Sequence, residues 1–237
     1  MKKLTICFCL FFAFSSFAEC KDWSNNSELS YNQNTGNSDL TSLLIKNHTT
    51  YQIDEGLIWY GKQNINYGKS NGIKNVENFL VETGIKSFLD DELYFKSKGS
   101  WLKDDFRGLK QQVSVGVDMG YLIPVSQPHD LTIESGLNIV KEEYVNKTHT
   151  QTVIWRNYGN YVYKINLTRR FQQSLELFTD FQDSEKHKIN SITALICSLS
   201  EHLDIKTSYT IKYNYKPIPK DLEKIDTVLA VSLLINF

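Results

Sequence analysis

Apolar and polar residues alternate along most of this chain. In the C-terminal segment, an apolar row at every second position alternates with smaller and more polar residues; the row ends with Leu229, Val231, Leu233, Ile235 and Phe237. The segment 203–215 alternates in the same way, with polar residues at even positions. Successive side chains of a β-strand point to opposite faces, so this period of two predicts two-faced strands.

The same pattern recurs often enough to predict an all-β chain. Further alternating segments lie at 78–86, 112–121, 131–139, 161–168 and 174–181, and 189–199 is apolar on both rows. Weaker patterns predict strands at 23–34, 40–51, 54–61 and 93–101. Strands of roughly ten residues suit a tilted crossing of a bilayer. We therefore expect a single antiparallel transmembrane β-barrel of about twelve strands with up-and-down topology.

The connections between these strands are expected to alternate in length. Tight or moderate turns are expected at 52–53, 89–90, 124–128, 169–170 and 200–201. Mostly longer, polar connections are expected at 62–75, 102–110, 141–158, 182–188 and 215–223. Short periplasmic turns and longer exterior loops are typical of outer-membrane barrels, which places both termini in the periplasm.

The first 18 residues have the features of a secretory signal peptide. Lys2 and Lys3 precede the apolar run 4–14, and the segment 15–18 supplies the small residues that a cleavage site after Ala18 requires. The run is shorter than the about 20 apolar residues of a membrane-spanning helix. We expect residues 1–18 to be the signal peptide and 19–237 to form the barrel domain.

Composition argues against several functional classes. The net charge of −1 gives no basic face for nucleic acid. Once the signal peptide is removed, Cys20 and Cys197 are the remaining cysteines, which make neither a disulfide framework nor a metal-ligand set. No phosphate-binding glycine loop or metal-binding spacing occurs, so we expect no cofactor.

Alternation alone does not show which row of side chains faces outward. A soluble lipocalin-like barrel also alternates, with its apolar row packed inward. The export signal, the terminal Phe237, the two classes of connection and the tyrosines near strand ends favour a membrane barrel, because tyrosines suit an interfacial girdle. We expect a location in the outer membrane of a Gram-negative bacterium, with lipid against the odd-numbered row.

The even-numbered row is then expected to line the lumen. Its charged members are Glu82, Lys86, Asp118, Glu134, Lys164, Glu176, Asp180, Asp204, Lys206, Lys212 and Asp226. Enclosed charges need partners or water. They either pair across strands and plug the lumen, or line a thin wet channel. Their mixed signs argue against a strongly ion-selective pore.

An enzyme and a surface-binding protein are the alternative classes. Outer-membrane hydrolases need a histidine paired with a nucleophile, or carboxylates, at the outer rim. His149 and His187 are expected in exterior loops, where ordinary polar residues explain them, so we expect no catalytic residue. A ligand or adhesion surface would use the connection 141–158, which holds Tyr144, Trp155, Arg156 and Tyr158.

Several segments resemble YdiY-type proteins, described as salt-induced outer-membrane proteins. The segment 35–39 is similar to the Thr-Gly-Asn-Thr-Asp turn near the start of that family, 105–121 resembles its middle, and 208–214 with 224–227 and the final aromatic residue resembles its C-terminus. The resemblance implies a small barrel linked to salt or envelope stress, with no catalytic residues to carry over. Asp118 departs from the small residue expected between its neighbouring glycines.

The C-terminal row has a second expected role. By analogy with other outer-membrane barrels, Phe237, Ile235, Leu233, Val231 and Leu229 imply recognition by the outer-membrane assembly machinery during folding. The expected partners are this machinery, outer-membrane lipid and small solutes. We expect a narrow small-solute channel or, as the resemblance to YdiY-type proteins implies, a structural component of the salt or envelope-stress response.

Overall fold

Twelve strands and their connections make up the part of the chain that the computed structural model describes. This part covers residues 22–237 except 35–39, 72, 105–107, 184–185 and 217–222, so the expected signal peptide lies outside it. The strands are β1 Trp23–Asn34, β2 Leu40–Asp54, β3 Leu57–Ser70, β4 Ile73–Phe88, β5 Leu93–Asp104, β6 Leu109–Ile123, β7 His129–Tyr144, β8 His149–Lys164, β9 Arg169–Asp180, β10 His187–Ser198, β11 Leu203–Asn214 and β12 Ile225–Asn236.

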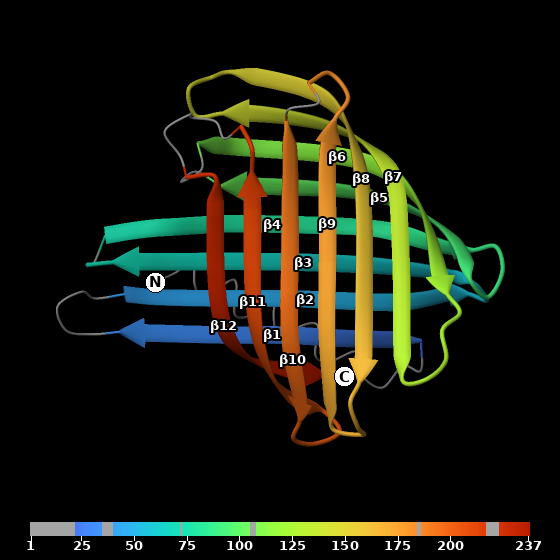
Figure 1. Ribbon diagram of the computed structural model, residues 1–237. Coiled ribbons are helices and arrows are strands. Elements are labelled where there is room, and N and C mark those ends of the chain that lie inside the picture. The colour runs from blue at the N-terminus through green and yellow to red at the C-terminus, as the bar shows by residue number, and fades with distance from the viewer. Residues whose placement is uncertain (1–21, 35–39, 72, 105–107, 184–185, 217–222) are drawn as a thin grey trace.

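These strands form one closed antiparallel barrel (Figure 1). Each strand pairs with its neighbours in sequence, and β1 closes the sheet by pairing with β12. The structure therefore confirms the predicted fold class. Among the described residues, no helix is long and apolar enough to cross a membrane.

The barrel has an apolar outer wall and a charged interior. On β6, Val113, Val115, Val117 and Met119 are exposed, with 63% of Val115 accessible, whereas Asp118 between them is 0% exposed. Side chains that are buried include Glu28, Lys96, Glu134 and Arg156. A soluble barrel would bury its apolar row and expose its charges. The lipocalin-like alternative is therefore wrong.

The two ends of the barrel are distinguished by the chain termini. The terminal end holds Trp23, Phe237 and the connections 55–56, 89–92, 124–128, 165–168 and 199–202. The loop end holds the described residues of the connections 71–72, 105–108, 145–148, 181–186 and 215–224. At the terminal end, Asn25 and Phe237 exchange two backbone hydrogen bonds, of 3.0 and 2.9 Å.

Several predicted connections are wrong because the strands extend into them. The expected loop 62–75 shrinks to 71–72, and the expected loop 141–158 shrinks to 145–148. The expected turn at 52–53 lies instead at 55–56, where Gly56 adopts a positive φ of 75°. Arg169 and Arg170, expected in a turn, begin β9. The polar residues in these stretches belong to strands whose inner face is polar. A polar stretch of sequence therefore does not by itself identify a loop in this chain.

Candidate functional site

A cluster of paired charges occupies the inner face of β5 to β9. Arg156, on β8, is its centre: its Nη1 donates to Asp118 Oδ2 at 3.1 Å and to Glu134 Oε2 at 2.8 Å, and its Nε donates to Glu176 Oε1 at 2.6 Å. Guanidinium groups suit this role, since they present several donors in a fixed plane. One cation thus joins three carboxylates from three different strands.

Two lysines of β5 complete the cluster. Lys98 Nζ lies 2.7 Å from Asp118 Oδ2, and Lys96 Nζ lies 2.9 Å from Glu134 Oε2. The Tyr94 hydroxyl donates to Glu134 Oε1 at 2.8 Å. We call Lys96, Lys98, Asp118, Glu134, Arg156 and Glu176 the central charge cluster. Its three cations balance its three carboxylates, as enclosed charges require.

Glycines on the inner face make room for these long side chains. Gly120 is the ladder partner of Tyr94, and a Cβ there would overlap the Tyr94 ring. Gly136 is the ladder partner of Asp118, and a Cβ there would overlap Asp118. Tyr94 and Asp118 therefore each lie over a glycine on the next strand. This complementarity lets β5, β6 and β7 carry a dense layer of polar groups.

A second charge cluster lies on the opposite wall, where β1 meets β12. Glu28 accepts from Lys206 at 2.9 Å and from Ser232 at 2.9 Å, and Lys46 lies 3.4 Å from it. Nearer the terminal end, Arg170 pairs with Asp204 at 2.8 Å. Both walls of the lumen are therefore lined by ion pairs.

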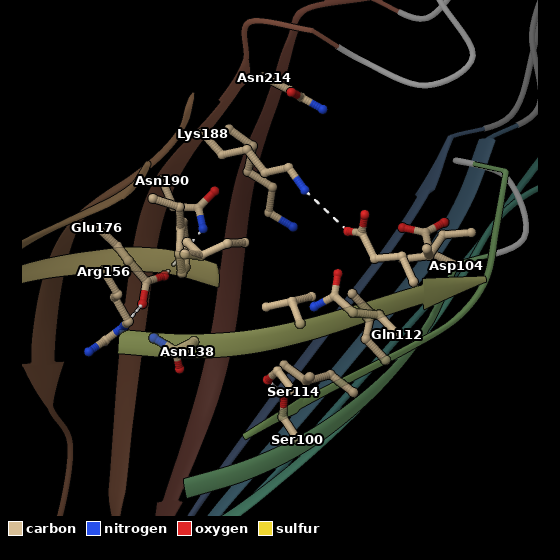
Figure 2. A pocket seen from close by; sticks show the side chains of 18 of the residues that line it. Ser100, Asp104, Gln112, Ser114, Asn138, Arg156, Glu176, Lys188, Asn190 and Asn214 are labelled. Carbon is tan, nitrogen blue, oxygen red and sulfur yellow. Dashed lines mark hydrogen bonds and ion pairs between the residues drawn. The ribbon is translucent and has the colours of Figure 1, made fainter. Parts of the chain in front are cut away.

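A cavity of about 440 Å³ lies between the central charge cluster and the loop end (Figure 2). Its lining includes Glu82, Lys98, Asn138, Arg156 and Glu176 near the cluster, and it reaches Lys186, Lys216 and Glu223 near the loop end. In Figure 2, Asp104, Gln112 and Ser114 lie across this space from Lys188 and Asn190. The described lining residues include six basic and seven acidic side chains, so the cavity wall has no dominant sign. We call this space the lumen cavity.

The predicted lumen residues lie at three kinds of place. Asp118, Glu134 and Glu176 belong to the central charge cluster. Glu82, Asp180, Lys212 and Asp226 line the lumen cavity, as does Glu176. The remaining four have other partners. Lys86 lies 3.7 Å from the centre of the Tyr94 ring, Lys206 pairs with Glu28, and Asp204 pairs with Arg170. Lys164 pairs with Asp130 at 2.8 Å on the exposed rim of the terminal end.

Sequence reasoning missed the residue at the centre of the site. Arg156 was expected in an exterior loop with Tyr144, Trp155 and Tyr158, but all four are strand residues, so a loop-borne binding surface at 141–158 is wrong. The signal was available in the segment itself, because Trp155 and Arg156 continue the alternation of β8, with Trp155 exposed and Arg156 buried. Lys96 and Lys98 were not predicted to line the lumen. The opposite row of β5 includes Ser97 and Gly99, so the strand has no clear apolar row against which the lysines would stand out.

His149, His187 and the assembly residues do not line the lumen cavity. His149 and His187 begin β8 and β10, and the His187 ring stacks on Tyr215 with centroids 4.8 Å apart. Among the described residues, no group of three or more His, Cys, Asp or Glu side chains is placed to hold a metal ion. Leu229, Val231, Leu233 and Phe237 are exposed on the outer row of β12, which Ile235 shares.

The closed barrel, its charged lumen and its apolar wall give this chain the fold of outer-membrane, porin-like β-barrels. Three solved structures share this fold. The NanC porin is 13% identical, with a TM-score of 0.53 over 90% of this chain and 97% of that one. The translocator domain of the autotransporter NalP from Neisseria meningitidis is 9% identical, with a TM-score of 0.54 over 99% and 95%. The KdgM porin in complex with disordered oligogalacturonate is 9% identical, with a TM-score of 0.51 over 90% and 99%.

Within this class the chain belongs to a family described as proteins of unknown function, DUF481, whose model matches residues 27–237. None of the curated proteins compared with the chain matches it. Identities of 9 to 13% to the solved barrels show a shared fold alone.

Proposed function

We propose that this protein is a non-enzymatic channel of the Gram-negative outer membrane, through which small polar solutes pass. The observation that carries the proposal is the lumen cavity, a space of about 440 Å³ that extends from the central charge cluster to the loop end and is lined by charged, polar and apolar side chains. Polar groups and fixed charges lining a narrow passage set which solutes enter it. The ion pairs of the central charge cluster join strands of one wall, β5 to β9, and we propose that this cluster narrows the lumen to a constriction instead of plugging it.

The balance of charges along the cavity indicates the class of solute. Six basic and seven acidic side chains line it, and the cluster below is neutral as a whole. A passage of mixed sign favours small neutral or zwitterionic molecules over a polyanion. We therefore do not propose the polyanion oligogalacturonate, which is bound in the KdgM structure, as a solute of this chain. The resemblance to YdiY-type proteins adds a role during salt or envelope stress to the proposal.

Planar-bilayer recordings of the purified barrel test the channel. We expect discrete conductance steps. We expect Arg156→Ala to raise the step size roughly twofold and to shift the ion selectivity toward cations. The reason is that Asp118, Glu134 and Glu176 lose their shared cation. Lys164→Ala, which removes a rim cation, is the matched control and should leave both quantities unchanged. An absence of steps across a range of salts and solutes would contradict the channel.

A further inference from the structure

One wall of the lumen cavity carries a stripe of apolar side chains. Val140 on β7, Ile154 on β8 and Phe178 on β9 all line the cavity. Ile154 lies opposite Asn138, two residues from Val140. Phe178 lies opposite Arg156, two residues from Ile154. Each member is therefore a diagonal neighbour of the next on the inner face of the sheet, within reach of large side chains. We call these three residues the lumen stripe.

The lumen stripe differs from the rest of the inner face. The interior of an outer-membrane barrel is typically polar, because it holds water or paired charges. Val140 is 5% exposed, whereas Ile154 and Phe178 remain partly exposed toward the cavity. Apolar surface that faces an aqueous space is stabilised when a ligand covers it. The lumen stripe therefore favours a solute with an apolar part.

An ion pair spans the lumen stripe. Glu142 on β7 and Lys188 on β10 approach each other to 3.6 Å, so the pair reaches past β8 and β9, which carry Ile154 and Phe178. Figure 2 shows the ion pair of Lys188 as a dashed line across the cavity. Glu142 follows Val140 by two residues on β7, and Lys188 is the ladder partner of Phe178. The two charges therefore flank the two ends of the lumen stripe.

The two members of this ion pair are held to different degrees. Glu142 Oε2 accepts from the Tyr144 hydroxyl at 2.7 Å and from the Thr150 hydroxyl at 3.1 Å. The Lys188 side chain is 44% exposed, and its distance of 3.6 Å to Glu142 exceeds the 2.6 to 3.1 Å of the central charge cluster. An exposed ion pair of this kind contributes little stability. A solute can therefore separate the pair while Glu142 stays in place.

We propose that the lumen stripe, Glu142 and Lys188 together form a binding site for a small zwitterion with one apolar side group. The ammonium group of the solute binds Glu142, its carboxylate binds Lys188, and its apolar group covers Ile154 and Phe178. The two new charged contacts replace the ion pair that opens, and the apolar contact supplies the net gain. This inference rests on the proposed function, to which it adds a class of solute.

Isothermal titration calorimetry of the intact barrel in detergent, with leucine and with asparagine, tests the site. These two amino acids have the same charged groups and a similar size, and they differ in the polarity of the side group. We expect leucine to bind roughly tenfold more tightly than asparagine, because the leucine side group is buried against the lumen stripe. Equal affinities, or no binding of leucine, would overturn the proposal.

Two isoleucine variants locate the apolar contact. Ile154→Thr makes the lumen stripe more polar, and Ile192→Thr makes the same change on β10, at a residue outside the lining of the lumen cavity. We expect the affinity for leucine to fall roughly fivefold in the first variant and to stay unchanged in the second. Equal affinities in the two variants, whether reduced or not, would place the apolar contact elsewhere and overturn the proposal.

Two lysine variants test the contact with the carboxylate. Lys188→Gln removes the cation beside the lumen stripe, and Lys164→Gln removes a cation from the rim of the terminal end. We expect the affinity for leucine to fall roughly tenfold in the first variant alone. Equal affinities would contradict the role of Lys188.

Conductance measured on the same samples separates this inference from the proposed channel. A conducting barrel that does not bind leucine contradicts the binding site alone. Leucine binding to a barrel without conductance steps contradicts the channel alone.

Discussion

At the scale of single residues, glycine positions decide which side chains fit inside the barrel. Tyr94 is almost completely buried, its ring lies over Gly120, and Lys86 lies over the same ring. Its hydroxyl holds Glu134, which in turn accepts from Lys96 and Arg156. The position of one ring therefore influences the whole central charge cluster.

Gly120→Ala tests this dependence. The new methyl group would displace the Tyr94 ring and weaken its hydrogen bond to Glu134, so we expect a loss of about 1–3 kcal/mol in the free energy of unfolding. Urea titration of the barrel folded in lipid vesicles measures it. Gly159→Ala is the control, because a Cβ there would have no described heavy atom within 4 Å apart from those of Gly159 and its two chain neighbours. Equal losses in both variants would contradict the role assigned to Gly120.

At the scale of strands, outward polar residues occur where they can bond to one another. On β1 and β2, Asn25, Ser27, Asn47 and Thr49 form a hydrogen-bonded group with distances from 2.7 to 3.1 Å. The ladder places Ser27 opposite Asn47 and Asn25 opposite Thr49. Internal pairing reduces the cost of polar groups on a lipid-facing wall. This group lies where β1 pairs with β2 near the terminal end.

Cysteine pairs across β1 and β12 test the register of their ladder. In a background with Cys20 and Cys197 replaced by serine, we expect Ser27→Cys with Ile235→Cys to form a disulfide readily, because these positions are directly opposite. Ser27→Cys with Val231→Cys places the two thiols four residues out of register, and we expect this pair to remain reduced under the same mild oxidation. Non-reducing gel shifts report both pairs. Equal oxidation of the two pairs would contradict the register.

The alternation of the sequence predicted the strands well and their ends poorly. A period of two is a direct consequence of strand geometry, so β6, β7, β11 and β12 could be read from it. Strand ends could not, because inward-facing residues such as Thr150 and Thr152 are as polar as loop residues. The central charge cluster depends on register: Lys96, Asp118, Gly136 and Arg156 lie in one row across four strands. Alternation assigns each residue to a face and leaves its cross-strand partner undetermined.

At the scale of the whole molecule, the barrel places its termini and its lumen cavity at opposite ends. Phe237 pairs with Asn25 at the terminal end, whereas the cavity extends toward the loop end. In a barrel with periplasmic termini, the cavity would face the cell exterior. In that orientation, the proposed channel opens to the cell exterior through its lumen cavity.

Labelling of intact cells tests the orientation. In the cysteine-free background, Asn146→Cys in the connection 145–148 should react with a membrane-impermeant maleimide, whereas Leu167→Cys in the connection 165–168 should react after the outer membrane is permeabilised. Both connections are short and lie at opposite ends of the barrel, so the pair is matched. The reverse order of reactivity would invert the orientation, and equal reactivity in intact cells would contradict a membrane-spanning barrel.

The four-residue hairpin between β7 and β8 has a practical consequence for how cells would display this protein. It joins two of the longest strands, and Lys147 turns the chain there with a φ of 65°. A foreign peptide inserted at this point would project from the rim without crossing the mouth of the barrel. An antibody against such an insert should therefore bind to living bacteria while solutes continue to pass through the channel.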